Sequence, residues 1–182
     1  MKELALYILD LAQNSVRAGA KNVEIEIEEN PQEDLLTVYV KDDGCGMKKE
    51  FLEKVTSPFV TTRKERRVGL GIPLFKELTE ECEGTFEIFS EEGKGTRIKG
   101  TFKLSSVNLI PIGDIASTIV SLIMSAPQID IVYRFKKGSR EFEFDTKKIR
   151  EVLKDVNLND VRVLSWIREY VEEGMKKSEM EV

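Results

Sequence analysis

Three polar side chains are spaced so that one face of a helix would carry them together. Asp10, Asn14 and Arg17 lie four and three positions apart in "DLAQNSVRA", and residues at these spacings share a helix face. A carboxylate, an amide oxygen and a guanidinium can orient water, bind Mg²⁺ and contact phosphate. The spacing therefore favours a nucleotide site, although a merely exposed polar stripe would show the same pattern.

Glycine clusters follow at three later places. "DDGCG" (42–46) comes directly after a strand-like run, "GLG" (69–71) precedes a helical run, and "GKGT" (93–96) lies between two strand-like runs. Glycine lets a ligand approach the backbone, and a helix N-terminus attracts phosphate. Each cluster alone is weak, because ordinary turns and hairpins contain the same residues. Their fixed order along the chain favours a binding site.

The elements that would position these clusters form an α+β layer. Apolar residues at helical spacing predict the helices, and alternation such as Val23, Ile25 and Ile27 predicts half-buried strands that pair as hairpins. We expect a two-layer α/β sandwich with a mixed, largely antiparallel sheet that is covered by helices on one face. The expected order is helix, strand, strand, helix, strand, strand, over residues 2–18, 21–29, 35–40, 71–81, 85–90 and 96–104.

Residues 105–182 carry none of these clusters and are expected to form a small C-terminal α+β region that could bind a partner. A hairpin over 129–145 and two helices are predicted, the helices capped by Asp145 and by Asn159 or Asp160. The last helix is expected to end at Gly174, with a frayed tail after it.

The helix over residues 113–125 is apolar on several faces, with Ile119 at its centre. A helix of this kind is buried, but the sequence does not say against what. We expect it to contribute to a homodimer or a partner interface. The alternative is that it lies wholly inside this chain.

Composition excludes several classes of protein. The 182 residues carry a net charge of -5, which disfavours broad nucleic-acid binding. No apolar run reaches the length of about 18 residues that a membrane span needs, and a cytoplasmic protein is expected. Histidine is absent, and the two cysteines have no zinc-like spacing.

Taken together, the four clusters resemble the GHKL ATPases, the superfamily with the Bergerat fold that includes histidine kinases, DNA gyrase and heat-shock chaperones. The resemblance covers residues 1–104 and implies an ATP-binding domain that uses Mg²⁺. It implies that Asn14 chelates the metal, that Asp10 activates water as the catalytic residue, and that Arg17 reaches a phosphate. Asp42, and not Asp43, would recognise the adenine amino group.

The same resemblance assigns nucleotide contacts to the rest of the motif residues. They are Gly44, Gly46, Met47, Phe59, Thr61, Thr62, Arg67, Gly69, Leu70, Gly71 and Thr96. The short basic lid also contains Arg63, Lys64 and Arg66, and we expect one or two of its side chains to contact phosphate while the others stay solvated. Mismatch-repair and gyrase relatives carry glutamate where this chain has Asp10, so hydrolysis is less assured than binding.

The resemblance leaves three functions open. The chain could be an ATP-dependent regulatory or assembly module that binds a protein, a serine/threonine kinase like the anti-sigma factors, or a slow ATPase. A self-phosphorylating histidine kinase is excluded within these residues because they contain no histidine. The whole chain also resembles free-standing bacterial ATP-binding proteins that are sometimes encoded beside iron-only hydrogenase and ferredoxin-like subunits. This resemblance implies a regulatory or assembly role and leaves the partner unidentified, with a redox or hydrogenase-associated protein as one candidate.

Overall fold

Alternating apolar residues build a six-stranded sheet. The computed structural model describes residues 2–56 and 70–180. Its strands are β1 (Asn22–Asn30), β2 (Leu35–Asp42), β3 (Phe86–Glu91), β4 (Gly95–Lys103), β5 (Asp130–Lys137) and β6 (Arg140–Asp145), in the spatial order β3-β4-β2-β1-β5-β6. The three expected hairpins are confirmed. Within the described sheet, β1 and β5 alone run parallel, which makes the sheet mixed but mostly antiparallel.

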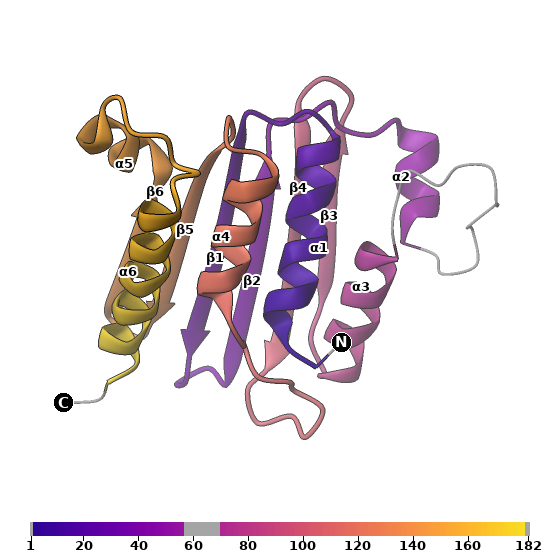
Figure 1. Ribbon diagram of the computed structural model, residues 1–182. Coiled ribbons are helices and arrows are strands. Elements are labelled where there is room, and N and C mark those ends of the chain that lie inside the picture. The colour runs from indigo at the N-terminus through magenta and orange to yellow at the C-terminus, as the bar shows by residue number, and fades with distance from the viewer. Residues whose placement is uncertain (1, 57–69, 181–182) are drawn as a thin grey trace.

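Helices cover one face of this sheet (Figure 1). The four that lie in front of it are α1 (Leu4–Arg17), α3 (Gly71–Glu81), α4 (Ile115–Ser125) and α6 (Val161–Glu179). Two shorter helices, α2 (Lys49–Val55) and α5 (Thr146–Leu153), lie at opposite ends of the sheet. The expected α+β class is confirmed, whereas α2 was not expected, because its seven residues are too few for a periodic signal.

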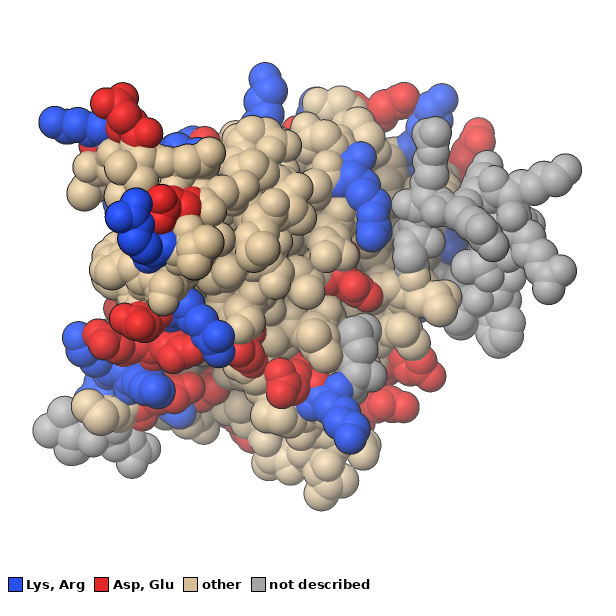
Figure 2. Space-filling model, in the orientation of Figure 1, with Lys and Arg blue, Asp and Glu red and all other residues tan. Residues whose placement is uncertain are grey.

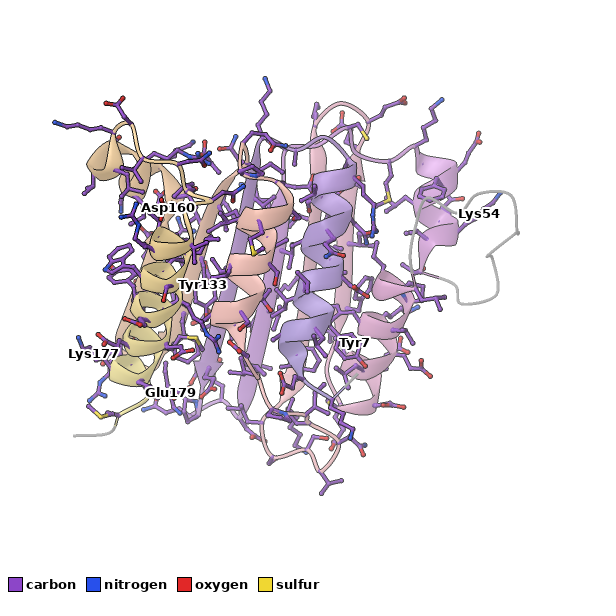
Figure 3. All side chains as sticks on the ribbon, viewed as in Figure 1. Tyr7, Lys54, Tyr133, Asp160, Lys177 and Glu179 are labelled. Atoms are coloured by element: carbon purple, nitrogen blue, oxygen red, sulfur yellow. The ribbon has the colours of Figure 1, made fainter. Side chains whose placement is uncertain are left out.

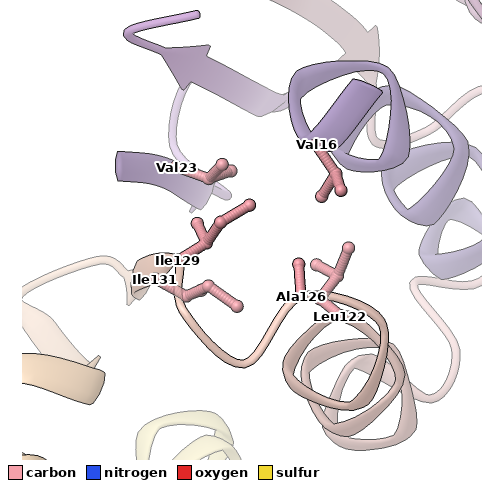
Figure 4. Close-up of a pocket in the computed structure, with 6 residues that line it drawn as sticks. All are labelled: Val16, Val23, Leu122, Ala126, Ile129 and Ile131. Atoms are coloured by element: carbon pink, nitrogen blue, oxygen red, sulfur yellow. The ribbon is translucent and has the colours of Figure 1, made fainter. Parts of the chain in front are cut away.

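The two regions of the chain share one core. Strand β5 pairs with β1 over its whole length, so Tyr133 lies beside Ile25 in the ladder. Side chains from both regions, including Val16 of α1 and Leu122 of α4, also surround a small apolar gap (Figure 4). The gap is too tight to admit a water molecule. The boundary at residue 104 stays a prediction, and the strands on its two sides belong to one sheet.

Helix α4 corrects the expectation of an interface helix. It lies on the sheet between α1 and α6 (Figure 1), and Asp114 caps its N-terminus through the Ser117 amide at 2.8 Å. Ile119 is fully buried and Leu122 is 2% exposed, whereas Met124 is 59% exposed. The apolar faces are therefore buried between two neighbouring helices and the sheet. Sequence periodicity could not reveal this, because it does not count a helix's neighbours.

Helix α6 corrects a second expectation, because it does not end at Gly174 but runs on to Glu179. A Cβ at Gly174 would overlap the ring of Phe142, so this glycine allows the helix to pack on β6. The following turn is held as well, since Ser178 is buried and its hydroxyl donates to the carbonyl oxygen of Gly174 at 3.0 Å. The tail expected to fray is thus helical as far as Glu179.

Contacts near both ends of α6 hold this helix in place. Tyr133, labelled in Figure 3 beneath this helix, is fully buried, and its hydroxyl donates to the Met175 sulfur at 3.4 Å. Burial raises the pKa of Tyr133 above its ordinary value. At the other end, Asp160 caps α6 as expected, and hydrogen bonds from Arg162 lower the pKa of Asp160 to about 2.

Candidate functional site

Helix α1 brings the first polar cluster to the front of the site. Leu4, Ile8 and Leu11 anchor its inner face in the core, and the polar positions four apart are left half-buried. The Asn14 side-chain oxygen accepts a hydrogen bond from Arg17 at 3.0 Å. The expected shared face is therefore present for this pair.

Asp10 of α1 lies against the first residue of α3. A Cβ placed at Gly71 would be 3.1 Å from the Asp10 Cβ, which is tighter than ordinary packing. Glycine at this position thus lets the N-terminus of α3 approach α1. The first and third sequence clusters meet here, through Asp10 and Gly71, which are 61 positions apart in the chain.

The N-terminus of α3 has the properties of an anion site. No side chain of the described residues caps it, since Leu70 occupies the cap position and is 54% exposed. Pro73 lacks an N–H, so the first-turn amides without a partner among the described residues are those of Gly71 and Ile72. Free helix N-terminal amides favour phosphate oxygens.

Asp42 ends β2 and is held from two directions. One carboxylate oxygen accepts from the Ser15 hydroxyl of α1 at 2.7 Å, and the other accepts from the Gly44 amide at 2.9 Å. Thr96 of β4 lies directly opposite Asp42 in the ladder, and its hydroxyl is 2.8 Å from that of Ser90. Asp42 and Thr96, separated by 54 positions, are thus brought together by the sheet.

Ser15 and Ser90 are positioning residues that the sequence reasoning missed. Ser15 directly follows Asn14 and is buried on the inner face of α1. A polar residue at an inner helix position was the sequence signal that could have identified it. Ser90 also accepts from the Met47 amide at 2.9 Å, which ties the loop after Asp42 to β3. No sequence pattern pointed to Ser90, because its partners lie in the loop after Asp42 and on the neighbouring strand β4.

Asp43 has a different task from its neighbour. Its carboxylate accepts from the amides of Lys21 and Asn22 at 2.7 and 2.8 Å, and from the Asn22 side chain at 2.7 Å. Desolvation by itself raises the pKa of Asp43, but these hydrogen bonds outweigh it and hold that pKa below its ordinary value. Asp43 therefore fastens the turn between α1 and β1, and Asp42 is the carboxylate left facing the site.

Two glycines of the site are required by the fold itself. Gly46 and Gly95 have φ angles of +64° and +97°, a region that other residues rarely adopt. A Cβ at Gly46 would overlap the carbonyl oxygen of Glu91, and one at Gly95 would overlap that of Asp42. Close approach of the chain to itself explains these glycines; the expected approach to a ligand stays a prediction.

Part of the expected site lies outside the described residues. These positions are Phe59, Thr61, Thr62, Arg63, Lys64, Arg66, Arg67 and Gly69. The structure therefore describes the floor of the candidate site, formed by α1, the end of β2, the start of β4 and the N-terminus of α3.

The donor set fits one Mg²⁺ that is shared with a phosphate ligand. Magnesium in nucleotide sites takes one or two protein oxygens and completes its shell with phosphate oxygens and water. An amide oxygen has two lone pairs, so Asn14 keeps one acceptor position beside its bond to Arg17. Across residues 2–56 and 70–180, no three acidic, histidine or cysteine side chains gather into a metal cluster. A metal at Asn14 would therefore depend on the bound phosphate.

A surface hollow is lined by other residues than these. It has a volume of about 340 Å³ and is bordered by Leu153, Val156 and Trp166 near the start of α6. None of its lining residues belongs to the four clusters.

Among the described residues, no helix is both long and apolar enough to cross a membrane.

Comparison with known proteins agrees with this geometry. A family model described as histidine kinase-, DNA gyrase B-, and HSP90-like ATPase matches residues 2–106, more than half of the chain. A putative sensor protein of Shewanella frigidimarina is 33% identical over 106 residues, which cover 57% of this chain and 16% of that protein. Sporulation kinase C of Bacillus subtilis is 31% identical over 104 residues, which cover 57% of this chain and 24% of that kinase.

The chain thus spans less than a quarter of the length of these two relatives. Among solved structures, the N-terminal domain of a DNA repair protein superposes with a TM-score of 0.53 at 12% identity, covering 79% of this chain and 52% of that one. This likeness concerns the fold alone. By the family match over residues 2–106 and the order of its motifs, the chain belongs to the histidine kinase-, DNA gyrase B-, and HSP90-like ATPase family, whose domains bind ATP.

Proposed function

We propose that this chain is a Mg²⁺-dependent ATP-binding module that regulates or assembles a protein partner. The observation that carries the proposal is the placement of Asp42. A carboxylate has about four acceptor positions, and Ser15 and Gly44 occupy two of them. Asp42 is therefore oriented and still able to accept from the amino group of adenine.

The remaining roles follow from neighbouring elements. Asn14 would hold Mg²⁺, the first amides of α3 would receive phosphate oxygens, and Arg17 would contact a phosphate. Asp10, beside Gly71, is the candidate base for a water molecule. Bound Mg²⁺ would neutralise phosphate charge. We place this function in the cytoplasm, in keeping with two free cysteines among the described residues.

Adenine recognition is tested with a pair of neighbouring variants. Asp42→Asn replaces a charged acceptor by an amide and should weaken ATP binding by about 1.5 to 3 kcal/mol. Asp43→Asn removes the same charge one residue later and should leave the preference for ATP over GTP intact, because its carboxylate is used by the turn. Calorimetry with both nucleotides measures the effect. Equal affinity of the wild type for ATP and GTP would refute the proposal.

A second experiment separates the regulatory module from its rivals. The main rival is a serine/threonine kinase like the anti-sigma factors, followed by a slow ATPase. Two relatives are named sporulation kinases, which supports testing for phosphate transfer but does not name the acceptor residue. The protein is incubated with γ-labelled ATP and a candidate redox partner, the class that the whole-chain resemblance favours. Label on the partner indicates a kinase, release of free phosphate indicates an ATPase, and ATP binding without either indicates a regulatory module.

A further inference from the structure

Strand β6 forms one edge of the described sheet. It pairs with β5 through a two-residue turn at Gly138 and Ser139, with φ of +58° at the glycine. In such a hairpin, residues alternate between pairs that exchange hydrogen bonds and pairs that do not. The main-chain groups of Phe142 and Phe144 therefore form hydrogen bonds with β5. Those of Glu141 and Glu143 point outward, away from β5.

These outward groups are free of partners within the described part of the chain. No main-chain hydrogen bond from Glu141 or Glu143 reaches any element beyond the strand pair. The edge carries no proline. Four of its six residues are charged, and charges discourage pairing with a like-charged strand, so a pairing segment must complement them. An extended segment could add to it as a further strand.

Two exposed aromatic residues overhang the same edge. Tyr170 of α6 packs on Phe142 and Phe144, with ring centroids 5.5 and 6.4 Å apart. Trp166 stacks on Tyr170 at 5.1 Å. The tryptophan is 46% exposed and Tyr170 is 40% exposed. Helix α6 lies between α4 and the β6 end of the sheet (Figure 1). The contacts of Tyr170 with Phe142 and Phe144 place the aromatic pair at that end.

The other face of the edge is acidic. Glu141 is exposed, and Glu143 lies 2.9 Å from Arg134 and 2.6 Å from Lys148. Asp145 lies on this face as well. Around α6, acidic and basic side chains are mixed, whereas a broad uncharged area covers the central helices (Figure 2). The edge therefore offers aromatic surface on one face and, on the other, the exposed carboxylate of Glu141 next to the ion-paired Glu143.

This charge pattern argues against a second copy of the chain. If two copies joined their β6 edges antiparallel with all helices on one face, residues of like orientation would lie opposite one another. Glu141, Glu143 and Asp145 of one copy would then face the same set in the other. Like charges directly opposite destabilise a strand pair.

We propose that the edge of β6, with Trp166 and Tyr170, binds an extended segment of another protein in which lysine or arginine alternates with apolar residues. The apolar side chains contact the aromatic pair, and the basic ones lie beside Glu141 on the open face. Main-chain bonds to the outward groups of β6 hold the segment. This inference rests on the partner-binding part of the proposed function.

The probe is a short capped peptide in which lysine alternates with valine. Trp166 is the single tryptophan of the chain, so its fluorescence reports binding without a label. We expect saturable binding that weakens with salt, together with slower amide exchange at Glu141 and Glu143. A peptide that alternates glutamate with valine should bind at least about tenfold more weakly.

Two substitutions at one position separate main-chain pairing from charge. Glu141→Pro and Glu141→Gln lose the same charge, but only proline removes an outward N–H, which the ladder to β5 does not use. The proline variant should bind the basic peptide about tenfold more weakly than the glutamine variant. Trp166→Ala should also weaken binding of the basic peptide, which is then followed by amide exchange because the fluorescent residue is gone. This variant tests the proposal if the proline variant fails to fold.

Three results would overturn the proposal: no response of Trp166 to the basic peptide, equal affinity of the proline and glutamine variants, or a wild-type dimer that Glu141→Pro dissociates. Calorimetry with ATP on the same preparations tests the nucleotide function separately. A protein that binds ATP but not the peptide overturns the docking surface alone. One that binds the peptide but not ATP supports the surface and refutes the nucleotide function.

Discussion

Residues 2–104 carry every described residue of the candidate nucleotide site, whereas residues 105–180 carry none, yet both parts contribute strands to one sheet. In the first part, glycines and polar residues at fixed spacings made the site visible in the sequence. In the second part, apolar helices and an edge strand have no such signature. A region without motifs can therefore still be needed by the region that has them, because core packing does not require particular residues at fixed spacings.

The largest effect that would test this comparison is removal of the second region. A chain ending at residue 104 loses the parallel neighbour of β1, and α1 loses its contact with α4. We expect a loss of about 5 kcal/mol or more, comparable with the whole stability of many domains, and no sharp unfolding in urea. A fragment that unfolds cooperatively and binds ATP would instead make residue 104 a true domain boundary.

A single charge in the shared core should have the next largest effect. Ile119→Glu places a carboxylate at a fully buried position of α4 and should cost about 3 to 5 kcal/mol. Met124→Glu on the same helix is the matched control, and should change stability by less than about 0.5 kcal/mol because Met124 is 59% exposed. Urea unfolding and solution mass measure both. A wild-type dimer that Ile119→Glu turns into a folded monomer would restore the interface expectation.

The first region is tested by separating metal binding from turnover on α1. Asn14→Ala should weaken Mg²⁺-dependent ATP binding at least about 100-fold, since it removes the proposed metal ligand. Asp10→Asn should preserve that affinity and lower any hydrolysis by about 10² to 10⁴-fold. Calorimetry and phosphate release provide the two measurements. Unchanged hydrolysis in Asp10→Asn would show that another group activates water.

The smallest expected effect concerns Asp43, which separates a structural carboxylate from its functional neighbour. Hydrogen bonds hold its pKa below the ordinary 3.8, so the folded state favours the charged form. Its contribution is therefore present above that ordinary value and is lost as the pH falls through the lowered pKa. Asp43→Asn should destabilise the protein at pH 7 and make less difference near pH 2. Equal losses at both pH values would contradict this account.

The sequence predicted the strands well, because apolar and polar residues alternate along them. Burial of one sheet face in the folded protein follows the same alternation. Val23, Ile25 and Ile27 are buried as expected, and the three hairpins form between neighbouring strands. The predicted end of α6 was wrong, because glycine commonly marks the C-terminus of a helix and Gly174 carries that signal. Here it is retained inside the helix, where the ring of Phe142 leaves no room for a Cβ.

The candidate site divides in the same way. Spacing along one helix was enough to group Asn14 with Arg17, since both lie within two turns of α1. Ser15 and Ser90 were not found, because their importance depends on contacts with Asp42, with the loop at Met47 and with β4, which form only in the fold. Asp42 was chosen over Asp43 by resemblance, and the carboxylate of Asp43 is indeed occupied by the turn before β1.

The sequence by itself determined the local elements, the order of the motifs and the membership in an ATPase family. These are properties of residue types at short or fixed separations, where backbone preference and side-chain period act directly. Only the tertiary structure decided that Asp10 lies against Gly71, that Thr96 faces Asp42 and that α4 is buried within the chain. Each of these depends on which surfaces meet when strands far apart in the sequence join one sheet, and that pairing is selected by burial of the whole core.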